Sequence, residues 1–113
     1  MSDQELVAAV AEKVMPLGVH PQANSSTNRV LVYSDGGFRT WKPLESWDDC
    51  FLVVRAMREK GYIFDMADNR TLEDISVAFY HVGRFAGATR CLRVDETAQR
   101  KAILEAAFKA VQA

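Results

Sequence analysis

The chain has 113 residues, of which 49% are apolar and 26% are charged, with a formal net charge of -1. Length and composition indicate a single globular domain, residues 1–113, and exclude a disordered chain. The near-zero charge does not favour nucleic acid as a partner, and it leaves homo-oligomer formation open.

Signals for export and membrane insertion are missing from the sequence. Residues 1–5 are polar and acidic, unlike a signal peptide. No apolar run approaches the roughly 20 residues that a transmembrane helix needs. A secreted domain of this size would usually carry more cysteines than Cys50 and Cys91. We therefore expect a cytoplasmic protein with reduced thiols and no membrane contact.

The first predicted element is a helix from Ser2 to Met15. Ser2 and Glu5 have the spacing of a capping box, in which each side chain satisfies a free backbone N–H of the other. Apolar residues then recur at helical spacing until Pro16 ends the helix. The polar segment 20–28 is expected to be a loop.

A β-hairpin is predicted next. Residues 29–33 are rich in β-branched and aromatic side chains, as strands are, and residues 38–41 form the return strand. Between them, the glycines of segment 35–37 can adopt the positive φ angles that a tight reversal demands.

The second helix is expected over residues 47–60. Ser46 and Asp49 have the spacing of a cap at its start, and Gly61 is a left-handed terminator at its end. Cys50 lies among the apolar positions of this helix, so we interpret it as a small residue that faces the core.

Two alternating strands and a less regular third one follow. Alternation predicts that three side chains of segment 62–66 share one side of a strand: Tyr62, Phe64 and Met66. In segment 75–81 the residues that share a face are Ile75, Val77 and Phe79. Residues 82–89 contain two glycines and predict a turn followed by an irregular or edge strand.

A helix over residues 96–112, capped by Asp95 or Thr97, is the last element. The predicted order is α, β-hairpin, α, two or three strands, α. Consecutive strands joined by short turns pair antiparallel. We therefore predict an α+β protein with three helices and a small, mostly antiparallel sheet, rather than a doubly wound parallel sheet.

Several of these features together carry a family resemblance. They are the run Val-Ala-Ala-Val-Ala-Glu-Lys-Val at 7–14, the helix that starts at Ser46, the Gly61-Tyr62 entry into a strand, and the alanine-rich final helix around Ala102-Ile103. In these features the chain resembles the phage ABA sandwich family of small bacteriophage and prophage proteins. The resemblance implies an α/β/α sandwich, with helices on both faces of the sheet, and expression in the cytoplasm of a host. It implies no assigned activity.

No motif in the sequence requires a particular chemistry. The histidines and cysteines do not form a metal-ligand cluster, and the glycine pairs do not match phosphate-binding loops. We therefore expect no metal, no cofactor and no catalytic site. The weaker alternative is a hydrolase that uses Cys91 and His81, with Asp65 or Asp95 as the orienting carboxylate.

One electrostatic asymmetry suggests a binding surface. Segment 75–94 has no acidic side chain but contains a histidine and three arginines. If the hairpin joins the same sheet, a basic and aromatic patch forms that suits a planar anionic ligand such as a nucleotide. Its candidate residues are Arg84, Arg90, Arg93, Arg39, Trp41 and His81. The alternative is that the arginines pair with carboxylates of the helices and the aromatic rings belong to the core.

The sequence thus predicts a non-catalytic binding or interaction module of phage or prophage origin. Its partner would be a host protein or a small anionic ligand. The alternative is a structural or assembly component that forms a homo-oligomer, with Trp41 and Trp47 as exposed contact residues.

Overall fold

The computed structural model describes residues 2–15, 19–21, 30–34, 37–68, 74–81, 84–92 and 95–112. Its helices are α1 (Asp3–Lys13), α2 (Trp47–Glu59) and α3 (Glu96–Gln112). Its strands are β1 (Val19–Pro21), β2 (Val30–Ser34), β3 (Gly37–Thr40), β4 (Tyr62–Asp68), β5 (Asp74–His81) and β6 (Arg84–Leu92), and all strand pairs are antiparallel. The predicted α+β class, with three helices and antiparallel pairing, is confirmed.

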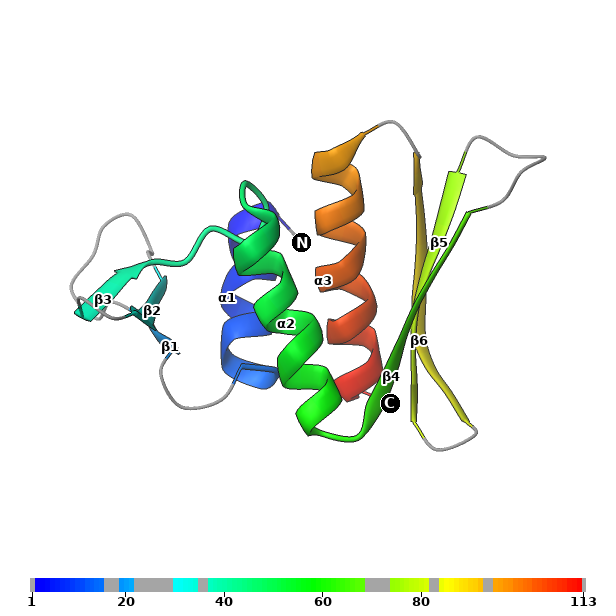
Figure 1. Ribbon diagram of the computed structural model, residues 1–113, viewed down its shortest axis with the longest axis horizontal. Coiled ribbons are helices and arrows are strands. Elements are labelled where there is room, and N and C mark those ends of the chain that lie inside the picture. The colour runs from blue at the N-terminus through cyan, green and yellow to red at the C-terminus, as the bar shows by residue number, and fades with distance from the viewer. Residues whose placement is uncertain are drawn as a thin grey trace.

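The elements form three layers (Figure 1). One layer is the sheet β4-β5-β6, the middle layer is the three helices, and the third is a separate small sheet, β1-β2-β3. All three helices lie on the same side of the β4-β5-β6 sheet. The layering implied by the family resemblance, with helices on both faces of the sheet, is therefore not found among the described elements.

The predicted hairpin is present as β2 and β3, but it does not join the larger sheet. It pairs instead with β1, whose residues His20 and Pro21 fall in a segment expected to be a loop. The predicted third strand after β5 also appears, as the edge strand β6, with a register shift at Phe79/Tyr80. Segment 82–83, where the turn was expected, lies outside the described residues.

Local sequence signals place the helix ends. Each helix start has a side-chain oxygen that accepts a hydrogen bond from the backbone N–H three residues on: Ser2 from Glu5 at 3.2 Å, Ser46 from Asp49 at 3.4 Å, and Asp95 from Ala98 at 3.0 Å. These bonds satisfy backbone donors that a helix leaves free at its start. Gly61, which follows the C-cap of α2, has the predicted positive φ of 96°. The first helix ends at Lys13, before the expected Met15.

The core lies between the helices and the inner face of the β4-β5-β6 sheet. The predicted inward residues of β5 are buried, and those of β4 pack against the core, so both alternation patterns are confirmed. The helix α3 packs against α1, α2, β5 and β6, and therefore contacts both the helical layer and the sheet. Its alanines (Ala102, Ala106, Ala107 and Ala110) are buried, and such small side chains let neighbouring elements approach closely.

Candidate functional site

The residues predicted to form a basic and aromatic patch do not gather on one surface. Arg84 and Arg90 lie on β6, and the register pairs Arg84 with His81 at the end of β5. Arg39 lies on β3, in the other sheet, and the helical layer separates the two sheets (Figure 1). Arg93 lies outside the described residues. The hairpin thus cannot complete an anion-binding patch with β6.

Trp41, the aromatic member of that patch, is part of the core. Its side chain is 2% exposed, and its indole Nε1 donates a hydrogen bond of 3.0 Å to the backbone carbonyl of Asp49. The segment between β3 and α2 folds over the start of α2 and buries the ring. The expectation that Trp41 is an exposed contact residue is wrong for this reason. Trp47 is half-buried beneath the guanidinium of Arg100, which lies 5.3 Å from its ring centroid.

The cysteine–histidine pair of the hydrolase alternative is separated by the sheet register. Cys91 pairs with Ile75 near the start of β5, whereas His81 is the last residue of that strand. Six strand residues span about 20 Å, so the two positions cannot form a catalytic pair. The thiol of Cys50 is fully buried as predicted, and burial raises its pKa to about 12 although the positive charge of Arg100 opposes the rise. A thiol in that environment stays protonated and is a poor nucleophile.

The described part of the chain lacks two other classes of site. None of its helices is long and apolar enough to cross a membrane. Its histidine, cysteine, aspartate and glutamate residues form no cluster of three or more that could hold a metal ion.

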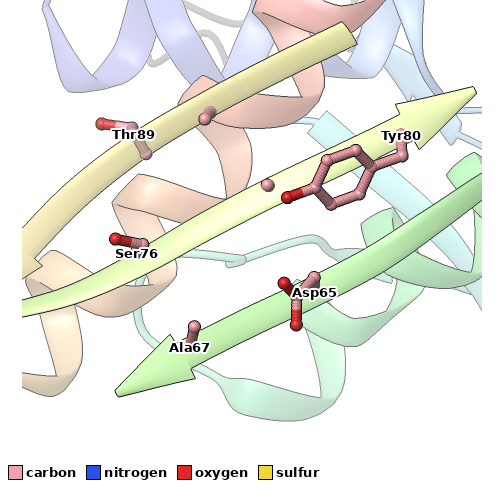
Figure 2. A pocket seen from close by; sticks show the side chains of 7 residues that line it. Asp65, Ala67, Ser76, Tyr80 and Thr89 are labelled. Atoms are coloured by element: carbon pink, nitrogen blue, oxygen red, sulfur yellow. The ribbon is translucent and has the colours of Figure 1, made fainter. Parts of the chain in front are cut away.

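The side of the β4-β5-β6 sheet that faces away from the helices carries the most distinctive surface. Alternate side chains of a strand point to opposite faces, so the residues between the inward ones point outward. We call this surface the outer face. Among the residues whose side chains the structure describes, its members are Ile63, Asp65 and Ala67 on β4, Ser76, Ala78 and Tyr80 on β5, and Ala88 on β6. Figure 2 shows Asp65, Ser76 and Tyr80 on this surface, with the helices behind the sheet.

A shallow groove of about 440 Å³ runs over the outer face. One alanine from each of the three strands lines the groove: Ala67, Ala78 and Ala88. Their short side chains form the floor of the groove. In Figure 2 the Asp65 carboxylate stands on the edge strand β4, and the Tyr80 ring lies over the central strand β5. Asp65 is exposed and has no hydrogen bond or ion pair with another described residue. Among the described residues that line it, the groove offers shape, apolar surface and one carboxylate, but no set of reacting groups.

The sequence contained a signal for this surface. The alternation that placed Tyr62, Phe64 and Met66 on the core side also assigns Ile63, Asp65 and Ala67 to the opposite side. The charge pattern of segment 75–94, which carries the predicted patch, does not indicate the apolar character of the outer face.

The free edge of the sheet at β6 is partly protected. Lys109 of α3 donates a hydrogen bond of 3.3 Å from Nζ to the backbone carbonyl of Ala88. A lysine held against an edge strand opposes pairing with a further strand. The face of the sheet is thus a better contact surface than this edge.

A second exposed apolar group lies on α2. Phe51 is 50% exposed and stacks on Trp47, with 5.4 Å between the ring centroids. Exposed neighbours Asp48 and Arg55 surround it with charge. Isolated apolar groups of this kind are common on soluble proteins, so the outer face is the stronger candidate.

Comparisons with known proteins yield no relative. The chain matches no protein-family model, no curated protein and no solved structure. Membership of the phage family that its sequence resembles therefore stays a prediction.

Proposed function

We propose that this protein is a non-catalytic interaction module that binds a protein partner through its outer face. The observation that carries the proposal is the apolar character of that face. A solvated face of an antiparallel sheet normally carries polar side chains. Here alanine or isoleucine occupies the positions 63, 67, 78 and 88. Ile63 is 62% exposed, Ala67 is exposed and Ala88 is partly exposed, whereas Ala78 at the centre of the sheet is 6% exposed. Exposed apolar surfaces that are rimmed by polar groups are typical of protein contacts.

A protein partner fits this surface better than an anionic ligand does. The described arginines of the predicted patch are divided between two sheets, and the groove carries the carboxylate of Asp65. A carboxylate beside the groove repels a phosphate or a nucleotide. In this proposal the protein is a small accessory protein of phage or prophage origin that acts on a host protein in the host cytoplasm, as the family resemblance suggests.

The test compares two variants that place the same bulky cation at two exposed alanines. Ala67 lies in the groove and Ala8 lies on α1, and both side chains are exposed. We expect Ala67→Arg to abolish capture of a specific host protein, because the arginine side chain fills the groove. Ala8→Arg should retain capture at the wild-type level. Equal capture by wild type and both variants would show that the outer face is not the binding surface.

Assembly as a homo-oligomer through the same face is the alternative function. An exposed apolar face could serve this role as well, since it is available in every copy. Light scattering at high protein concentration separates the two functions. An oligomer that Ala67→Arg dissociates and Ala8→Arg leaves intact would favour assembly, and a monomer throughout would favour binding to another protein.

A further inference from the structure

We infer that the occupant of the outer face is an amphipathic α-helix of the partner, which lies along the strands and places a lysine or arginine beside Asp65. This inference rests on the proposed function, and it specifies the partner's secondary structure and charge.

The dimensions of the face suit one helix. Strands β4, β5 and β6 have 7, 8 and 9 residues. At about 3.4 Å per residue they are roughly 24–30 Å long, and spacings of about 4.8 Å put the two outer strands about 10 Å apart. A helix has a diameter of about 10 Å and rises 1.5 Å per residue, so about 18 residues cover the face.

The arrangement of small and large side chains on the outer face also suits a helix. The register sets Asp65, Ala78 and Ala88 side by side across the three strands, and the Ile63–Tyr80 pair lies nearer one end. Ala67 is exposed and Ala88 is partly exposed, so the backbone of a helix can approach closely over these two alanines, while Ala78 between them is 6% exposed. The larger side chains of Ile63 and Tyr80 would then contact the apolar stripe of that helix at one end of the groove.

Charge complementarity sets the chemistry of the helix. The carboxylate of Asp65 projects beside the apolar groove and is exposed. It forms no hydrogen bond or ion pair with the other described residues. A partner that covers it with apolar groups would bury an uncompensated charge, which is costly. A lysine or arginine at the edge of the partner's apolar stripe would instead form a charge-assisted hydrogen bond with it.

Two other occupants fit less well. A second copy of the chain that docks through its own outer face would add a second Asp65 carboxylate to the contact instead of a cation, which raises the cost of covering these charges. A strand added at the β6 edge would have to compete with Lys109, which donates to the Ala88 carbonyl. A single helix laid in the groove meets neither obstacle.

The test is selection from a display library of 18-residue amphipathic helices, with a randomised apolar stripe and a randomised flanking position, against the full chain. We expect the selected helices to carry lysine or arginine at the flanking position. Their affinity should fall at least tenfold on Asp65→Lys and recover when the peptide's cation is changed to glutamate. Ala67→Arg should abolish binding, and Ala8→Arg should leave it unchanged. Amide shifts on addition of a selected peptide should concentrate on β4, β5 and β6.

Several outcomes would overturn the inference. One is a library that yields no binding helix, and another is a set of selected helices that bind the Asp65→Lys variant as tightly as wild type. A third is a change in the amide shifts of the outer face with protein concentration in the absence of peptide, which would indicate a second copy as the occupant. The proposed function can survive these results. Suppose that wild type captures a host protein through a segment with no helix and no cation, and that Ala67→Arg does not capture it. In that case the proposed function stands and the helical occupant is refuted. If Ala67→Arg retains the host protein, both are refuted.

Discussion

The indole Nε1 of Trp41 donates a 3.0 Å hydrogen bond to the backbone carbonyl of Asp49 in the first turn of α2. The carboxylate of Asp49 in turn accepts a 2.8 Å hydrogen bond from the backbone N–H of Lys42. Both Trp41 and Asp49 are 2% exposed. Two hydrogen bonds, one buried and one partly buried, are therefore donated by segment 41–42 to Asp49 and fix the segment that enters α2. This segment also carries the N-cap residue Ser46.

Trp41→Phe should destabilise the protein by about 1–3 kcal/mol, because it removes a buried donor and leaves space in the core. Urea unfolding followed by circular dichroism measures the change. Phe51→Leu is the control, since Phe51 is half exposed, and should change the free energy of unfolding by less than about 0.5 kcal/mol. Equal stabilities of Trp41→Phe and wild type would contradict the role of this hydrogen bond.

Arg100→Lys should cost about 1–3 kcal/mol although it keeps the charge. The guanidinium is largely buried, donates from Nε to the Leu44 carbonyl at 2.8 Å, and lies over the Trp47 ring. A lysine ammonium cannot reproduce both contacts. Arg55→Lys is the matched control, because that side chain is 77% exposed and its contact with a glutamate at 3.8 Å is weak. Comparable losses in the two variants would argue against a special role for Arg100.

The Cys50 thiol should make stability depend on alkaline pH. Its pKa is about 12 in the folded protein, against an ordinary value of 9.0. Below pH 9 both states hold the proton and stability is unaffected. Between these pKa values the unfolded chain releases the proton first, so stability falls as pH rises, by about 1 kcal/mol at pH 10. Denaturation at pH 8 and pH 10 gives the difference in free energy of unfolding between wild type and Cys50→Ala. This difference should be smaller at pH 10 than at pH 8.

The same burial should protect the Cys50 thiol from alkylation. In a Cys91→Ser background, iodoacetamide should modify Cys50 only after denaturant is added. Modification of the native Cys91→Ser protein at the rate of the unfolded chain would contradict the burial.

Gly61→Ala should destabilise the protein by about 1–2 kcal/mol, because an L side chain at a φ of +96° is strained. The strain is in the backbone, since the added Cβ would lie 3.6 Å from Nε2 of His81, an ordinary contact distance. Gly61→Asn should lose less than Gly61→Ala, because asparagine tolerates left-handed backbone better. Thermal unfolding orders the three proteins, and an alanine variant as stable as wild type would contradict the prediction.

The sequence predicts those features that short stretches of chain determine. The caps at Ser2, Ser46 and Asp95, the terminator Gly61 and the alternation in β4 each depend on residues within a few positions, and the structure has all of them. Features that depend on distant pairing were missed. Two separate sheets form because the hairpin strand β2 pairs with β1 and the hairpin does not pair with β4. Strand propensity alone contains no information about that choice.

The candidate surface was missed for a related reason. Positions 63, 65 and 67 could be assigned to the outer side from alternation, but whether helices cover that side depends on the whole topology. Trp41 shows the converse case. Its neighbours gave it the pattern of an exposed hairpin residue, and only the return of the chain over α2 buries it.

The position of α3 has a consequence for biosynthesis. Because α3 contacts α1, α2, β5 and β6, the elements made before it lack their shared packing partner while the chain is still being synthesised. We expect the nascent chain to expose apolar surface until α3 leaves the ribosome, and to fold in one late step rather than element by element. Chaperones that bind exposed apolar segments should therefore engage this protein mainly before α3 emerges.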